Sequence, residues 1–186
     1  MMKRLSNEFN YSLFLPLFLF YLISIGIQSL AAELDGVDVK SVMMKQILFC
    51  LLSLAAMGIV SRITTSHLLK YAPLFYVLSL GLMALLYWFH DPAMFAVTNT
   101  KRWLRIGGFS FQPSELMKLS FILFMVRLTL IDEMNQPQRS LRNDLGYIGK
   151  ILLYSLPTFL LMFMQRDFGT SLVFIAILGA LFVISG

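Results

Sequence analysis

Long apolar runs separated by short polar stretches make up most of this chain. A bilayer core needs about 20 helical residues, so runs of this length are typical of helices that cross a membrane. Six such runs are predicted, at residues 11–32, 44–61, 71–90, 114–131, 147–164 and 171–186. The pattern therefore predicts an all-α fold, a polytopic bundle of transmembrane helices forming part of a single integral membrane domain. The last run is apolar to the end of the sequence, so we expect it to be truncated and the chain to be the N-terminal part of a longer protein.

Composition supports the membrane class and excludes a soluble one. Hydrophobic residues make up 58% of the chain and charged residues 13%, and the mean hydropathy is +0.77. The net charge of +5 comes from basic residues that flank apolar runs, so we expect contact with membrane lipids and not with nucleic acid. Lys3, Arg4, Arg62 and Lys70 predict a cytoplasmic N-terminus. Cys50 is the only cysteine, which excludes an intramolecular disulfide.

Two residues inside the runs carry predictions of their own. Arg127, near the end of the fourth run, is expected to extend its side chain to the lipid headgroups. Pro157 is expected to kink the fifth helix, with polar groups of neighbouring helices compensating the freed carbonyl.

The segment at residues 91–113 falls outside the membrane by parity, yet it is basic. Its charged residues are Lys101, Arg102, Arg105 and the single acid Asp91. This bias runs against the usual preference for basic loops in the cytoplasm, so it needs a structural reason. Gly107 and Gly108 predict a turn before the fourth helix.

The stretch at residues 102–118, RWLRIGGFSFQPSELMK, concentrates ionisable groups between apolar runs. Charges in such surroundings usually face a protein interior or a hydrated cavity. Glu115 and Lys118 are three residues apart and share a helix face, so they can pair. They form either a structural ion pair or the polar lining of a cavity that opens outward, which Asp167 would join.

The basic residues before this helix suit a phosphate group. Lys101, Arg102 and Arg105 can bind the phosphate of a lipid ligand, or they can simply contact headgroups and water. Trp103 fits the headgroup layer in either case. The sequence contains no metal-ligand spacing and no nucleophile–base arrangement, so no metal site, no cofactor and no catalytic residue is predicted in this chain.

Two stretches resemble the signatures of one bacterial family. RWLRIGGFSFQPSELMK resembles the RW…G…FQPSE…K signature of the SEDS proteins of shape, elongation, division and sporulation, and QRDFGTSLV resembles their second signature, QPDLGT. The FQPSEL wording is most similar to the RodA elongation branch. The matching positions are Arg102, Trp103, Gln112, Pro113, Ser114, Glu115, Lys118, Gln165, Asp167, Gly169 and Thr170. Arg166 and Phe168 depart from the Pro and Leu of the signature.

The resemblance implies a ten-helix peptidoglycan glycosyltransferase of the bacterial cytoplasmic membrane. Such an enzyme polymerises lipid II, an undecaprenyl-diphosphate-linked precursor, during cell-wall elongation and shape maintenance, with a class B penicillin-binding protein as its transpeptidase partner. Its catalytic carboxylate lies on an outer loop that would follow Gly186, and a divalent cation assists departure of the lipid diphosphate. The resemblance therefore implies that this part alone is inactive.

These expectations combine into one hypothesis with two rivals. Arg102 and Arg105 would steady the diphosphate, while Glu115, Lys118 and Asp167 would organise one polar hollow among the fourth to sixth helices. A lipid II flippase would instead need a polar path that reaches both leaflets. A membrane scaffold for cell-wall synthesis and division would tolerate neutralisation of these charges.

Overall fold

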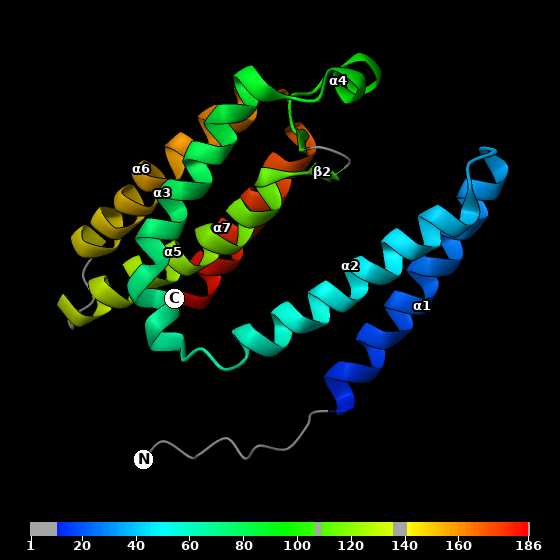
Figure 1. The fold of residues 1–186 in the computed structure, drawn as a ribbon. Coiled ribbons are helices and arrows are strands. Elements are labelled where there is room, and N and C mark those ends of the chain that lie inside the picture. Colours follow the sequence, from blue (N-terminus) through cyan, green and yellow to red (C-terminus); the bar gives the residue numbers. More distant parts are fainter. Residues whose placement is uncertain (1–10, 107–108, 136–140, 186) are drawn as a thin grey trace. The chain divides into compact units, whose positions relative to one another are not determined.

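The fold was analysed in a computed structural model that describes residues 11–106, 109–135 and 141–185, with side chains described over 15–105, 110–134 and 144–185. The chain divides into two compact units, Met1–Ile63 and Thr64–Gly186 (Figure 1).

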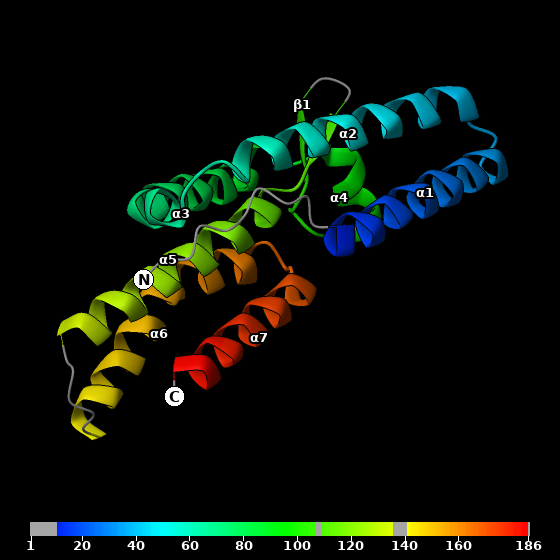
Figure 2. The same ribbon diagram turned by 90° about the horizontal axis from the view of Figure 1, so that it is seen from below.

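The first unit is a pair of antiparallel helices, α1 (Tyr11–Leu34) and α2 (Val39–Val60) (Figures 1 and 2). Gly36 takes a φ of 68° in the turn between them, a conformation that glycine adopts without steric cost. Asp38 then caps α2, because its side chain accepts hydrogen bonds from the backbone N–H groups of the second and third residues after it. Most described side chains of both helices are exposed, which suits contact with lipid.

The second unit is a bundle of four long helices. These are α3 (Thr65–Phe89), α5 (Pro113–Asn135), α6 (Leu141–Met164) and α7 (Phe168–Ser185). The closest packing is between α3 and α5, and α6 and α7 pack on α5 and on each other (Figures 1 and 2).

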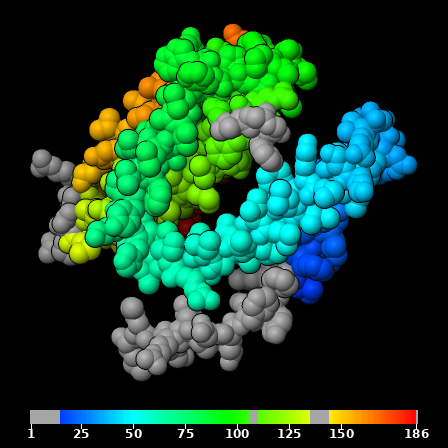
Figure 3. Space-filling model, viewed as in Figure 1, coloured from blue at the N-terminus to red at the C-terminus, as the bar shows by residue number. Residues whose placement is uncertain are grey.

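A short irregular region joins α3 to α5. It contains α4 (Pro92–Thr98) and the antiparallel strands β1 (Leu104–Ile106) and β2 (Phe109–Phe111), with Arg105 opposite Ser110. The predicted turn at Gly107 and Gly108 lies outside the described residues, as do residues 136–140. We call the end of the second unit formed by α4, residues 99–103, β1, β2 and the α6–α7 turn the hairpin end; α4 and residues 99–105 are green in Figure 3.

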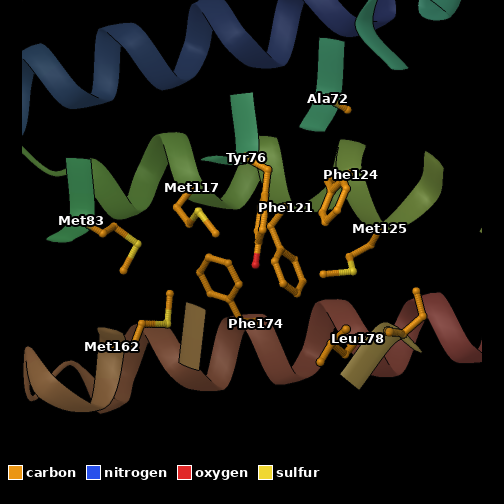
Figure 4. Packing of buried hydrophobic residues seen from close by; sticks show 11 residues of the cluster. Ala72, Tyr76, Met83, Met117, Phe121, Phe124, Met125, Met162, Phe174 and Leu178 are labelled. Atoms are coloured by element: carbon orange, nitrogen blue, oxygen red, sulfur yellow. The ribbon is translucent and has the colours of Figure 1, made fainter. Parts of the chain in front are cut away.

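Aromatic and methionine side chains fill the middle of the second unit. Phe121 of α5 and Phe174 of α7 meet edge to face with ring centroids 5.0 Å apart, and Tyr76 of α3 stacks on Phe124 at 4.5 Å. Figure 4 shows methionines beside these rings. The remaining buried members of the cluster are Ala72, Met83, Met117, Met125, Ile151, Met162 and Leu178.

Arg127 is bound to a neighbouring helix, a contact that the sequence did not predict, and its reach to the headgroups stays a prediction. Its Nη1 donates to the carbonyls of Leu69 and Lys70 in α3, at 2.7 and 2.9 Å. Pro73 explains this contact, because a proline has no N–H to offer the carbonyl four residues earlier, which is that of Leu69. The guanidinium thus satisfies a carbonyl that the helix itself leaves without a partner.

Pro157 lies within α6, and a neighbouring helix supplies a polar group beside it. The Tyr76 hydroxyl of α3 donates to the carbonyl of Tyr154 and lies 2.9 Å from the Thr158 hydroxyl oxygen. The proline frees the carbonyl of Leu153, whereas the tyrosine binds the next carbonyl along the helix, so the predicted kink and the compensation of the freed carbonyl stay predictions.

The all-α membrane class is confirmed, with α4 and the two short strands as local additions that the sequence did not predict. Among the described residues, five helices are long and apolar enough to cross a membrane: α1, α2, α3, α6 and α7. The predicted fourth run does form a helix, α5, but its charged residues keep it out of that set; they are Glu115, Lys118, Arg127, Asp132 and Glu133.

Helix starts lie earlier than the apolar runs predicted. The helices expected to begin at residues 44, 71, 147 and 171 begin at Val39, Thr65, Leu141 and Phe168. Their first turns are polar or contain capping residues, so they are helical without being apolar. An apolar run marks only the part of a helix that is suited to the hydrocarbon core, and the helix extends beyond that part at its N-terminal end.

Candidate functional site at the hairpin end

The segment at residues 101–106 is held by backbone hydrogen bonds on two sides. The Asp91 N–H donates to the Trp103 carbonyl at 2.8 Å, and the Lys101 N–H donates to the Gln165 carbonyl at 3.2 Å. Leu104 also forms an isolated antiparallel bridge with His90. Residues 101–106, which we call the RW segment, are therefore fixed between the end of α3 and the turn that joins α6 to α7.

Asp167 caps α7 from a buried position. Its Oδ1 accepts from the Thr170 N–H at 3.2 Å and its Oδ2 from the Thr170 hydroxyl at 2.7 Å, while the Ser171 hydroxyl donates to its carbonyl at 2.9 Å. Arg102 Nη1 lies 3.3 Å from Asp167 Oδ1. The Asp167 carboxylate therefore caps the N-terminus of α7 and, through Arg102, also anchors the RW segment.

Asp91 has a parallel role at the start of α4. Its Oδ1 accepts from the Ala93 N–H at 2.9 Å, and Pro92 occupies the first helical position. Arg105 Nη1 lies 3.9 Å from Asp91 Oδ2, a loose pair because the arginine side chain is 57% exposed. Asp91 was expected only to be an acid in a basic loop, although the Asp-Pro pair, an N-cap followed by proline, signals a helix start.

Gln165 ties the α6–α7 turn to α3. Its buried side chain donates from Nε2 to the Met83 carbonyl at 2.7 Å. Its Oε1 is buried and has no hydrogen-bond partner among the described residues, and the same holds for His90 Nδ1, Arg102 Nε and Ser114 Oγ. Buried polar atoms are nearly always paired. All four lie on residues at or next to the hairpin end.

A pocket of about 280 Å³ opens in the same region. It is lined by Tyr87, Phe95, Lys101, Met164, Gln165 and Arg166. The Lys101 ammonium lies 4.2 Å from the centroid of the Tyr87 ring and 5.9 Å from that of Phe95. Arg166 Nη1 donates to Asn99 Oδ1 at 3.3 Å, and Arg166 has a φ of 58° in the left-handed region.

Glu115 and Lys118 pair with each other, as their spacing predicts. Lys118 Nζ lies 2.7 Å from Glu115 Oε2, but the Glu115 side chain is 58% exposed. No described hydrogen bond or ion pair joins either residue to Arg102 or Asp167. The reason is helical geometry: Ser114 and Met117 face the core of the unit, which turns Glu115 outward. The structure therefore does not gather these charges into the one hollow that we expected, and their role in a substrate site stays a prediction.

The other motif residues position the chain locally. Pro113 is the buried first residue of α5, and the Glu115 N–H donates to the Gln112 carbonyl at 3.1 Å. Trp103 is partly buried, and Gly169 lies in the first turn of α7, where an added Cβ would meet no atom within 4 Å. Within the described ranges, no three or more His, Cys, Asp or Glu side chains come together as a metal site would need.

Comparison with known proteins places this geometry in context. A sequence profile of the FtsW/RodA/SpoVE proteins, described as cell cycle proteins, matches residues 8–186. The "Probable peptidoglycan glycosyltransferase FtsW" of Aliivibrio salmonicida is 34% identical over 143 residues, which are 76% of this chain and 33% of the relative. The protein of the same name from Saccharophagus degradans is 30% identical over 173 residues, 89% of this chain and 42% of the relative. No solved structure matches the chain.

The relatives qualify two expectations. The chain spans about a third of the first relative and about two fifths of the second. Both relatives are named FtsW, so the comparisons do not support the expectation, based on the FQPSEL wording, that the chain is closest to RodA.

Proposed function

The chain belongs to the FtsW/RodA/SpoVE family of cell cycle proteins, and from this premise we propose that it forms part of a peptidoglycan glycosyltransferase that polymerises lipid II. The protein is a multi-pass protein of the inner membrane. In this proposal its N-terminus is cytoplasmic and the hairpin end lies at the outer face, where the sugars and diphosphate of lipid II would be presented.

One observation carries the proposal: the two family signatures meet in space. Arg102 of the first signature pairs with Asp167 of the second at 3.3 Å, and the Lys101 N–H binds the Gln165 carbonyl. Two stretches that lie 65 residues apart in the chain thus form one polar structure. A shared structure of this kind supports a common task at the hairpin end.

Arg102 is the residue that we propose for the diphosphate. Its side chain is 32% exposed, so part of the guanidinium fork is left for an anion. Asp167 holds the other part and fixes the orientation. A preorganised cation at a departing diphosphate stabilises the charge that develops there, which is the usual source of large electrostatic effects in catalysis.

The core of the second unit supports a transferase over a transporter. The described middle of the bundle is filled by apolar side chains such as Met117, Phe121 and Phe174, and the Tyr76 and Thr158 hydroxyls there are bonded to each other. A flippase needs a hydrated path that continues to the other leaflet. The buried side-chain atoms that have no hydrogen-bond partner in the described parts of the chain lie instead on residues at or next to the hairpin end.

Other parts of the reaction belong to residues outside this chain. We propose that the general base, and any divalent cation, are held there, because Asp91 and Asp167 are both occupied as helix caps and arginine partners. A class B penicillin-binding protein is the proposed transpeptidase partner. The FtsW names of the relatives favour the division branch over elongation.

The test uses the protein expressed from its own gene and reconstituted in liposomes with a class B penicillin-binding protein and fluorescent lipid II. We expect glycan strands from the unchanged protein and a loss of about tenfold to a hundredfold in rate for Arg102→Ala. Arg62→Ala, at an exposed basic position just after α2, is the matched control and should keep the rate.

Two results would overturn the proposal. One is an unchanged polymerisation rate in Arg102→Ala at equal amounts of folded protein. The other is movement of lipid II between leaflets with no polymer formed, which would favour a flippase.

A further inference from the structure

We propose that the pocket between α3, α4 and the α6–α7 turn, which we call the Lys101–Arg166 pocket, binds a phosphate group that carries a neighbouring hydroxyl. Its lining is that given above, with Lys101, Gln165 and Arg166 as its polar members. The site goes beyond the proposed transferase reaction, because anion binding needs neither catalysis nor lipid II.

The distribution of charge at the hairpin end is the first argument. Four cationic side chains lie there, and two of them have carboxylate partners: Arg102 pairs with Asp167, and Arg105 pairs with Asp91. Lys101 and Arg166 form no ion pair with a carboxylate in the described parts of the chain. The two cations without carboxylates are the two that line the pocket.

The neighbours of these two cations hold them without neutralising them. The Lys101 ammonium lies over the Tyr87 ring, and a cation–π contact leaves the positive charge in place. Arg166 bonds to the neutral amide oxygen of Asn99. The guanidinium has five donors in a planar fork, so most of them remain for a ligand. Two cations that are held in place but not neutralised suit an anionic ligand.

Gln165 adds a requirement for a hydrogen-bond donor on the ligand. Its amide nitrogen must face the Met83 carbonyl, since two oxygens cannot share that bond, and this fixes the buried oxygen Oε1 as an acceptor. That acceptor has no partner among the described residues. A hydroxyl adjacent to the phosphate would satisfy it, which points to a glycerophosphate or sugar phosphate group rather than a bare anion.

Size and sequence agree with a small headgroup. A volume of about 280 Å³ is near the lower end for ligand pockets, roughly 300 Å³, and suits a phosphate with a few carbons. Arg166 is also one of the two positions at which this chain departs from the QPDLGT signature. Proline cannot adopt a φ of 58°, so the turn that places this arginine at the pocket could not form with the proline of the signature at position 166.

The experiment measures binding to the purified chain in neutral detergent. The soluble probe is glycerol 1-phosphate, followed by isothermal titration calorimetry. The lipid probe is phosphatidylglycerol, followed by native mass spectrometry against phosphatidylcholine, which has no net charge and no headgroup hydroxyl. The pocket variant is Lys101→Gln with Arg166→Asn, because asparagine tolerates a positive φ. The control is Arg62→Gln with Lys45→Gln, which removes two positive charges at exposed positions outside the pocket.

We expect the pocket variant to lose about tenfold in affinity for each cation removed and the control to bind as the unchanged chain does. Binding of both probes would identify the headgroup chemistry as the shared feature, and binding of phosphatidylglycerol alone would identify a lipid as the source. Arg166→Asn alone, at an exposed side chain, preserves the test if the double variant does not fold. Equal losses in pocket and control variants, or no binding of either probe, would overturn the proposal without affecting the transferase reaction.

Discussion

Arg127 is the side chain whose removal should reveal how α3 tolerates a proline inside the bundle. Its guanidinium donates to the carbonyls of Leu69 and Lys70 at 2.7 and 2.9 Å, and Pro73 leaves the first of these without a helical N–H. Arg127→Met keeps a long flexible side chain and removes both hydrogen bonds. The carbonyl of Leu69 then has no donor from its own helix.

The magnitude follows from the number and kind of bonds lost. Hydrogen bonds to charged groups contribute about 1.5–3 kcal/mol in soluble proteins, whereas bonds between membrane helices average about 0.6 kcal/mol and reach about 1.7 kcal/mol. Using the membrane values for two bonds, we expect Arg127→Met to lower the free energy of unfolding by ~1–3 kcal/mol. Most of this loss of unfolding free energy should come from the hydrogen bond to the Leu69 carbonyl, because the Lys70 carbonyl can still accept from its own helix.

A double-mutant cycle with Pro73→Ala isolates that share. An alanine N–H at this position can donate to the Leu69 carbonyl, so Arg127→Met should cost ~1 kcal/mol less in that background. The free energies are measured by reversible unfolding in mixed micelles of dodecyl maltoside and dodecyl sulfate, followed by circular dichroism. Arg62→Met serves as the control for loss of an exposed cation. Equal costs in both backgrounds, within ~0.3 kcal/mol, would refute the link between the arginine and the proline.

Three further predictions test the site and the core by thermal unfolding of the purified protein. Both Asp167→Ala and Asp167→Asn remove the ion pair with Arg102, but asparagine can still cap a helix. Asp167→Ala should therefore destabilise α7 by ~1 kcal/mol more than Asp167→Asn, and equal effects would contradict the capping role. Tyr76→Phe should cost ~1 kcal/mol through loss of the hydroxyl bonds to α6, and a neutral result would show that those bonds add nothing. Phe121→Ala should cost ~3–5 kcal/mol by leaving a cavity against Phe174, whereas Leu119→Ala, at a side chain 63% exposed on the same helix, should change stability by less than ~0.5 kcal/mol; similar losses for the two would mean that the core is misassigned.

The helices were predictable because each contains an apolar run long enough to identify it. Their first turns were not, since residues such as Thr65–Lys70 and Leu141–Gly146 are helical but polar or mixed in character. The charge pattern of α5 was recognised correctly as unusual for a membrane helix. Its consequence for Arg127 was missed, because a hydrogen bond to a carbonyl in α3 depends on Pro73, and no local pattern connects two residues on different helices.

At the hairpin end, the sequence identified the right stretches but not their partners. Arg102 and Asp167 were each singled out, yet their contact depends on how the α6–α7 turn meets the RW segment. Asp91 and the short helix α4 were missed although the Asp-Pro pair signals a helix start. The spacing of Glu115 and Lys118 left two alternatives, an ion pair or a cavity lining; the ion pair forms, and Glu115, one residue from buried Ser114, is turned outward.

The two arginine–aspartate pairs can form only one after the other as the chain is synthesised. Arg105 follows Asp91 closely in the chain, so both partners leave the ribosome almost together and the start of α4 can hold the hairpin early. Arg102 precedes Asp167 by 65 residues and must wait until α5 and α6 have been made before its carboxylate exists. The Arg102–Asp167 pair can therefore form only after the α6–α7 turn has been made.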